Sequence, residues 1–209
     1  MTVFDKKLLM DAVVRSADNS NDVPMWFAMS ATFGRELKAK ELLDEEQVQC
    51  FVPMRYEVLK QGRHKGTRRL VSVINNLIFV YADRKRIQLL KSKIAFLQYY
   101  THYVDGRNRP VVVPENQMRQ FIAVCNTLND KLLFLSPDEV NLSEGTRVRI
   151  AGGTFDGVEG TFVRVEKGRQ KKVVVMVEGI TAVALAKFTD GYLQPLEGSD
   201  NAASAVMSR

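Results

Sequence analysis

Residues 152–160 read GGTFDGVEG, a glycine-rich stretch between two short apolar runs, TRVRI and GTFVRV. A Walker phosphate loop needs GxxxxGK, then Ser or Thr and a helix, and a dinucleotide loop also needs a helix after its glycines. Here no lysine follows, the next segment has the pattern of a strand, and the acid spacing of a calcium loop is missing. The remaining interpretation is backbone geometry. Gly153, Gly157 and Gly160 permit positive φ or close strand approach, and Asp156-Gly157 is a strong turn dipeptide.

The segment around this stretch consists of short apolar runs separated by turn residues. TRVRI, GTFVRV, KKVVVMVEG and TAVALAKF follow one another from Gly145 onward. Several short strands close together are typical of a small β-barrel. We therefore predict a separate barrel domain over residues 145–197.

The preceding hundred residues mix strand and helix patterns. MWFAMS reads as a strand, TFGRELKAKELLDEE as a helix, and residues 48–58 and 68–82 as two long strands that form a hairpin around KQGRHKGT. DRKRIQLLKSK then reads as a basic helix, residues 95–104 as a strand, and the segment after Pro114 as a helix. The order β-α-β-β-α-β-α over residues 25–126 predicts an α+β sandwich with helices on one face of an antiparallel sheet.

The remaining segments read as tails and a connector. Residues 1–24 are expected to be a flexible tail with a short helix at Lys6–Val14, and residues 198–209 a second flexible tail. Residues 127–144 are expected to be a linker. Its KLLFL run is too apolar for a free linker, so it is expected to dock on a domain or to form a short strand or helix.

The net charge and the small number of cysteines limit which partners and sites the protein can have. A net charge of +6 and a pI of about 9.3 favour polyanionic partners, nucleic acid first, although charge alone fits a solvated surface equally well. Cys50 and Cys125 lie at core-like positions, and with His64 and His102 as the only histidines, neither a structural zinc site nor a disulfide framework is expected. No metal, cofactor or catalytic cluster stands out, so we do not expect an enzyme. A secretory signal and a membrane span are also missing from the pattern, which predicts a cytoplasmic protein.

The sequence resembles a known family at two places. GTRVRIAGGTFDGVEGTFVRV resembles the KOW motif, whose G-x-F-x-G-x-x-G turn is matched by Gly153, Phe155, Gly157 and Gly160. WFAM, the FGRE helix start, VQCFVP, the basic hairpin and NNLIFVYA resemble the N-terminal (NGN) domain of the NusG family. The resemblance covers about residues 25–196 and is closest to a specialised paralogue of the UpxY or RfaH kind. Asn75 and Asn76 stand where the family usually has Pro-Gly.

The resemblance implies an NGN-type α/β sandwich followed by a small SH3-like KOW barrel. It also implies an apolar depression that takes the clamp helices of RNA polymerase. The other interpretation is that several of the residues matching this depression belong to the ordinary core. Strand alternation puts Leu77 and Phe79 on one face of the sheet and Ile74 on the other, so these residues cannot all line one depression. The residues that match this depression are Ala28, Ile74, Leu77, Phe79 and Phe96.

Two basic segments are implied to meet nucleic acid. The start of the first helix matches the region where paralogues touch the non-template DNA strand, and Phe33 lies beside it. The hairpin, with five Lys or Arg residues and no acid, suits phosphate, an acidic polymerase loop or simple solvation. The KGRQKK strip at 167–172 leaves the same choice between RNA, a protein partner and solvent. The candidate nucleic-acid-binding residues are Thr32, Arg35, Lys38, Arg63, His64, Lys65, Arg68 and Arg69.

These resemblances imply a monomeric transcription elongation factor that promotes antitermination. The UpxY likeness points to capsular polysaccharide operons, with non-template DNA or nascent RNA as further partners. The KOW domain would recruit a ribosomal protein or a termination factor. Two alternatives stay open: a ribosome-associated KOW protein that binds structured RNA, and an enzyme whose distant residues converge.

Overall fold

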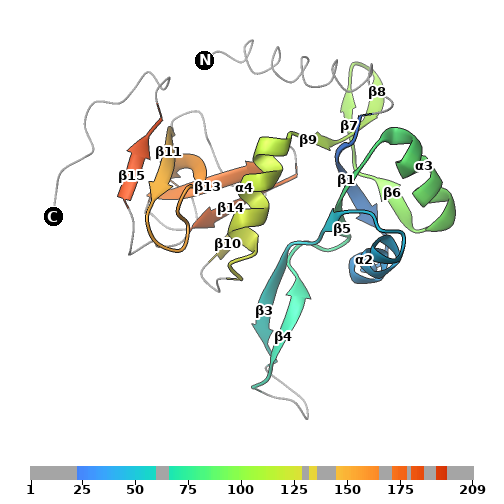
Figure 1. The fold of residues 1–209 in the computed structure, drawn as a ribbon, viewed down its shortest axis with the longest axis horizontal. Coiled ribbons are helices and arrows are strands. Elements are labelled where there is room, and N and C mark those ends of the chain that lie inside the picture. Colours follow the sequence, from blue (N-terminus) through green and yellow to red (C-terminus); the bar gives the residue numbers. More distant parts are fainter. Residues whose placement is uncertain are drawn as a thin grey trace. The chain divides into compact units, whose positions relative to one another are not determined.

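The computed structural model describes residues 23–59, 66–128, 132–135, 145–164, 171–177, 180–185 and 192–196 (Figure 1). The chain divides into two compact units. Unit 1 contains residues 1–57 and 69–115, and unit 2 contains residues 58–68 and 116–209. Most of the expected N-terminal tail with its helix at Lys6–Val14, the expected C-terminal tail and most of the KGRQKK strip lie outside the described residues.

Unit 1 is built on an antiparallel sheet of five strands. Its order is β2-β5-β1-β6, and β9 also pairs with β1. Along the central pair, Phe27 lies opposite Val80 and Ala28 opposite Phe79. The strands are β1 (Met25–Ala31), β2 (Cys50–Phe51), β5 (Leu77–Ala82), β6 (Leu97–Tyr99) and β9 (Val112–Val113).

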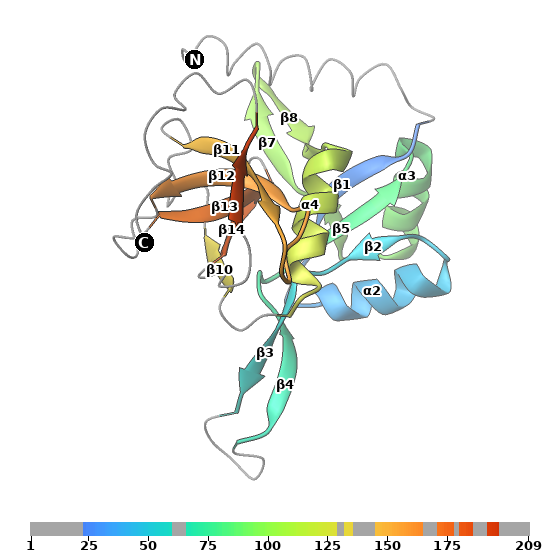
Figure 2. The ribbon, with the colours of Figure 1, turned by 60° about the vertical axis from the view of Figure 1, so that its left-hand side comes forward.

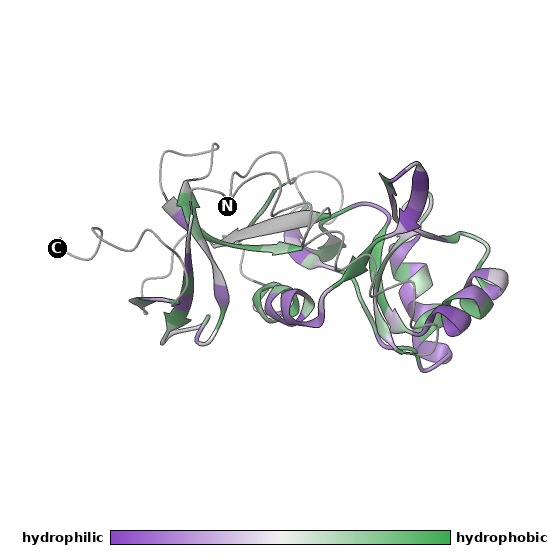
Figure 3. Ribbon diagram, turned by 90° about the horizontal axis from the view of Figure 1, so that it is seen from above, coloured by the Kyte–Doolittle hydropathy of each residue, from purple (hydrophilic) through white to green (hydrophobic). Residues whose placement is uncertain are grey.

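Two helices, α2 (Glu36–Glu45) and α3 (Arg84–Lys93), pack on one face of this sheet. Leu43 of α2 and Ile87 of α3 join Phe27 and Val80 in a single core cluster. Hydrophilic and hydrophobic residues occupy different sides of these helices (Figure 3). The helices therefore fold by burying an apolar stripe on the sheet, and the prediction of a mixed α/β fold is confirmed.

The three long strands predicted for this region are each interrupted, which corrects those predictions. Residues 48–58 form β2 and β3 (Met54–Val58), separated at Val52-Pro53, because proline has no N–H for a ladder. Residues 68–82 form β4 (Arg68–Ser72) and β5, separated by a bend that ends at Asn76, which has a φ of 66°. Residues 95–104 form β6 and β7 (Thr101–Val104).

Two ribbons leave the sheet. β3 and β4 pair as a two-stranded ribbon that extends away from it (Figures 1 and 2). β7 pairs with β8 (Arg107–Pro110), and this ribbon turns at Asp105 and Gly106, both with positive φ. A two-stranded ribbon buries little apolar area and is only marginally stable by itself.

Unit 2 contains α4 (Glu115–Cys125), apart from its first residue, and a six-stranded antiparallel sheet of order β10-β14-β13-β12-β11-β15. Among the described residues this order is an open series, and closure into a KOW barrel stays a prediction. The apolar run KLLFL contributes β10, which pairs with β14 at the edge of the sheet. The strands are β10 (Leu132–Leu135), β11 (Thr146–Ala151), β12 (Glu159–Arg164), β13 (Lys171–Val177), β14 (Thr181–Leu185) and β15 (Tyr192–Pro195).

Candidate nucleic-acid interface

The loop between β1 and α2 holds an aromatic ring out in solvent. Phe33 is 89% exposed and has a φ of 64°, and Gly34 beside it has a φ of 65°. Glycine adopts this conformation freely, but for phenylalanine it costs on the order of 1–3 kcal/mol. An exposed ring held at a cost in stability marks this loop as a candidate binding site.

Asn76 fixes this loop from the neighbouring bend. Its side-chain Oδ1 accepts a hydrogen bond from the Gly34 N–H at 2.7 Å, and its carbonyl accepts one from Ala31 at 2.7 Å. Its own N–H donates to the buried carboxylate of Glu36 at 3.2 Å. Asparagine tolerates positive φ better than most residues, which explains how it can stand where the family usually has glycine. The sequence analysis did not predict these hydrogen bonds of Asn76, which we call the Asn76 latch. The Asn-Asn dipeptide was their local signal in the sequence.

Arg35 lies between two aromatic rings. Its guanidinium carbon is 5.4 Å from the Phe33 centroid and 4.1 Å from the Phe96 centroid. Its Nε donates to the Thr32 carbonyl at 2.9 Å and its Nη2 to the Thr32 hydroxyl at 3.3 Å. Proteins that bind single-stranded nucleic acid combine cations with exposed aromatic rings in this way. The structure thus brings Thr32, Phe33, Arg35 and Phe96 into one cluster, which we call the Phe33 platform.

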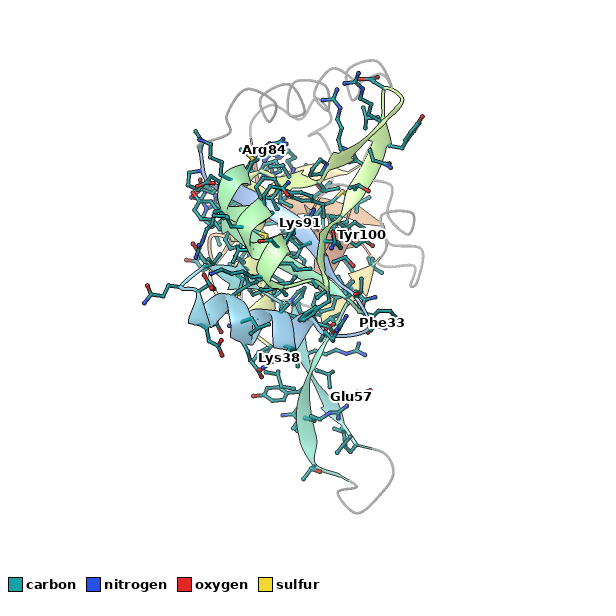
Figure 4. All side chains as sticks on the ribbon, turned by 90° about the vertical axis from the view of Figure 1, so that its right-hand side faces the viewer. Phe33, Lys38, Glu57, Arg84, Lys91 and Tyr100 are labelled. Atoms are coloured by element: carbon teal, nitrogen blue, oxygen red, sulfur yellow. The ribbon has the colours of Figure 1, made fainter. Side chains whose placement is uncertain are left out.

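Lys38 does not join the Phe33 platform. Its ammonium lies 2.9 Å from the Glu41 carboxylate, and this hydrogen bond raises the pKa of Lys38. The pair is exposed on α2 (Figure 4), where an ion pair contributes little to stability. A phosphate would have to compete with Glu41 for this ammonium.

The basic hairpin is described only in part. Arg63, His64 and Lys65 lie outside the described residues, whereas Arg68 and Arg69 are exposed on β4. Tyr56, Val58 and Leu70 are also more than a third exposed on the same ribbon. The described part of the hairpin therefore presents apolar side chains as well as charges.

The residues expected to form the polymerase depression differ in their exposure. Ala28, Leu77 and Phe79 are fully buried, on the sheet face opposite the cluster that packs on α2 and α3. Phe96 and Ile74 are half-buried. The alternation argument does not apply to Ile74, because it lies in the bend before β5 and its carbonyl accepts a hydrogen bond from Leu77.

The glycine-rich turn of unit 2 connects β11 to β12. Gly153 and Gly157 have φ values of 74° and 78°, and Phe155 is 5% exposed. A Cβ on Gly160 would lie 2.7 Å from the carbonyl oxygen of Val174 on β13, so this position needs glycine for close strand packing. Asp156 accepts a hydrogen bond from the Gly152 N–H at 2.6 Å, which uses its carboxylate inside the turn.

The cysteines lie in settings that suppress reactivity. Burial raises the pKa of Cys50 to about 11, and burial also raises the pKa of Cys125. Within the described ranges, His, Cys, Asp and Glu side chains do not gather in threes as metal ligands would. Every helix in the described part of the chain is too short or too polar to cross a lipid bilayer.

Comparison with known proteins finds a family match for the NGN-like region. Residues 24–122 match the NusG family, described as "Transcription termination factor nusG". Among solved structures, the chain is similar to one of NusG from Thermotoga maritima, described as "Domain interaction in Thermotoga maritima NusG". The identity is 20% and the TM-score 0.39, with 78% of this chain and 93% of that chain covered. A comparison with curated proteins gives no match.

The NusG match spans β1 through most of α4 and so includes the whole Phe33 platform. The description of the family names it as a transcription factor. The family region is therefore also the region that carries the exposed aromatic ring and its cation.

Proposed function

We propose that the chain is a transcription elongation factor that binds RNA polymerase and promotes read-through of terminators. The observation that carries this proposal is the NusG match over residues 24–122. A factor of this kind would act by binding the elongating state more tightly than the paused or terminating state, which shifts the balance between them. It would act in the cytoplasm as a monomer.

Polymerase would be held through the apolar residues of unit 1 by its clamp helices. Phe96 and Ile74 are half-buried and so reachable, whereas contact through Ala28, Leu77 or Phe79 requires that these side chains first become exposed. Exposed apolar groups rimmed by polar ones are typical of protein partners. The β3–β4 ribbon, with Arg68 and Arg69, would supply a second contact to polymerase or to nucleic acid.

The Phe33 platform would bind an unpaired base of the non-template strand, or of the nascent RNA. The base would stack on Phe33, and Arg35 would meet the adjacent phosphate. Lys38, after release from Glu41, would add a second cation. Read-through at a particular operon, with capsular polysaccharide synthesis as the case that the UpxY likeness suggests, would then depend on the sequence of the exposed strand.

Unit 2 would act as a KOW domain that recruits a ribosomal protein or a termination factor, with the Gly153–Gly160 turn as its signature. The alternative function is that of a ribosome-associated KOW protein that binds structured RNA. The net charge of +6 would suit either function.

Co-purification with RNA polymerase, followed by a terminator read-through assay, tests the proposed function. We expect the full chain to be captured by elongating polymerase at low salt and to increase read-through. Capture by ribosomal RNA in the absence of polymerase affinity would instead support the alternative. A failure to bind polymerase under these conditions would overturn the proposal.

A further inference from the structure

Helix α3 is strongly basic. Its ten residues, RKRIQLLKSK, contain five cations and no acid. Two of them, Arg86 and Lys93, are held by Glu46 at 2.9 and 2.6 Å. The hydrogen bond from Lys93 is the largest of the effects that lower the pKa of Glu46, and the charges of Lys93 and Arg86 and the hydrogen bond from Arg86 act in the same direction. These two cations are therefore already used within the protein.

A second group on the same helix surrounds Tyr99. Arg84, Gln88 and Lys91 are spaced by four and three residues, which puts them on one helix face. The Lys91 ammonium lies 4.4 Å from the centroid of the Tyr99 ring, and the Gln88 amide donates to the Tyr99 hydroxyl at 3.4 Å. Burial raises the pKa of Tyr99, and the charge of Arg84 partly opposes this shift. We call this group the Tyr99 cluster.

Arg84 and Lys91 are the two cations of the Tyr99 cluster. Across the described residues, no carboxylate pairs with Arg84 or Lys91. The Arg84 Nε is buried and has no hydrogen-bond partner among those residues. A buried donor without an acceptor is unfavourable, so the site favours a ligand that supplies acceptor oxygens. Figure 4 shows Arg84 and Lys91 along helix α3.

We propose that the Tyr99 cluster binds a backbone phosphate of a nucleic acid. Phosphate supplies oxygens for the guanidinium fork of Arg84, for the Lys91 ammonium and for the Gln88 amide, and charge-assisted bonds of this kind are the strong ones. The ring of Tyr99 packs against Phe27 at 5.6 Å between centroids and fixes the place of Lys91. The site deepens the proposed function, on which it rests, by adding a contact that is separate from the Phe33 platform.

The test compares two lysines of one helix in the full chain. Lys91→Gln removes a cation of the Tyr99 cluster, and Lys93→Gln, two residues later, removes one that Glu46 already holds. Binding to a short DNA duplex, a DNA single strand and an RNA hairpin is followed by fluorescence anisotropy over a range of salt concentrations. We expect Lys91→Gln and Arg84→Gln each to weaken the preferred nucleic acid by about tenfold at low salt. For a duplex the double variant Arg84→Gln/Lys91→Gln should lower the salt slope by about 0.9, the value for one phosphate contact, and each single variant by less. Lys93→Gln should change both by much less.

Three outcomes would overturn the site. Equal losses in Lys91→Gln and Lys93→Gln would mean unspecific attraction to a basic helix, and no loss in either would mean that α3 faces away from nucleic acid. A loss of polymerase capture with unchanged nucleic-acid binding would assign the cluster to a protein carboxylate. Lys91→Arg, which keeps the charge, should retain binding and guards against a folding defect. Because polymerase capture is measured on the unaltered chain as well, failure of the proposed function is seen separately.

Discussion

The guanidinium of Arg35 stacks 4.1 Å above the ring of Phe96, and so joins the start of α2 to the turn between α3 and β6. These residues are far apart in sequence, yet the backbone supports the contact, since the Thr32 N–H donates to the Phe96 carbonyl at 3.0 Å. The Phe33 platform therefore rests on the sheet and is more than a loop feature. This arrangement allows binding and stability to be separated by mutation.

The substitution Phe33→Gly should weaken nucleic-acid binding with little effect on stability. Glycine relieves the positive φ but loses the contact with Arg35 and gains freedom in the unfolded chain, so the free energy of unfolding should change by less than about 1 kcal/mol. Affinity for single-stranded DNA should fall roughly fivefold to a hundredfold, because one stacked base contributes about 1–3 kcal/mol. Anisotropy titrations and urea denaturation measure the two effects. Tyr103→Ala, at another exposed ring, is the control, and an equal loss there would remove Phe33 from the site.

The latch at Asn76 predicts an order of stabilities. Asn76→Gly keeps access to the φ of 66° and loses only the side-chain bond to Gly34, which should cost about 1 kcal/mol. Asn76→Ala loses the same bond and also carries a Cβ into the left-handed region, which should cost a further ~1–2 kcal/mol. Urea denaturation of the three proteins checks the order. Equal stability of the Gly and Ala variants would show that the bend relaxes when the side chain is removed.

Two glycines of unit 2 should respond differently to alanine. A Cβ at Gly160 meets the Val174 carbonyl oxygen at 2.7 Å, so Gly160→Ala must push β12 away from β13 and should cost several times more than Gly157→Ala. Gly157 has open space around it, and its penalty of about 1 kcal/mol comes only from a φ of 78°. Thermal unfolding followed by circular dichroism measures both. A smaller effect at Gly160 than at Gly157 would mean that the two strands are not packed this closely.

The thiol of Cys50 should be slow to alkylate. Its pKa of about 11, raised by burial, lowers the thiolate fraction at pH 8 by about a hundredfold relative to an ordinary thiol, and the greater nucleophilicity of the thiolate restores about tenfold. The net rate with iodoacetamide should be roughly tenfold below that of a model thiol and should rise steeply toward pH 11. Because the folded-state pKa is raised, the stabilising contribution is complete below pH 9 and is lost as the pH rises through 11. Cys50→Ser identifies the signal, and fast modification at pH 8 would contradict the burial.

Sequence patterns predicted the helices well and the strand ends poorly. The proline before α4 and the turn residues around β11 are local signals, and both elements lie where they were expected. Pro53 and Asn76 interrupt strands that hydropathy alone reads as continuous, because a missing N–H or a positive φ leaves the apolar pattern intact. The contact between Arg35 and Phe96, and that between Lys91 and Tyr99, depend on how separate elements meet. No spacing in the sequence indicates such contacts.

The short strand β10 has a consequence for dividing the chain. Leu132–Leu135 pairs residue by residue with Leu185–Ala182. One edge of β14 is therefore hydrogen-bonded to a segment that precedes Gly145 in the sequence. A C-terminal fragment cut at Gly145 would expose the N–H and C=O groups of an apolar edge, which is a template for self-association. Recombinant work on this half should therefore begin upstream of Leu132, or the fragment will be expected to precipitate for reasons unrelated to its biological role.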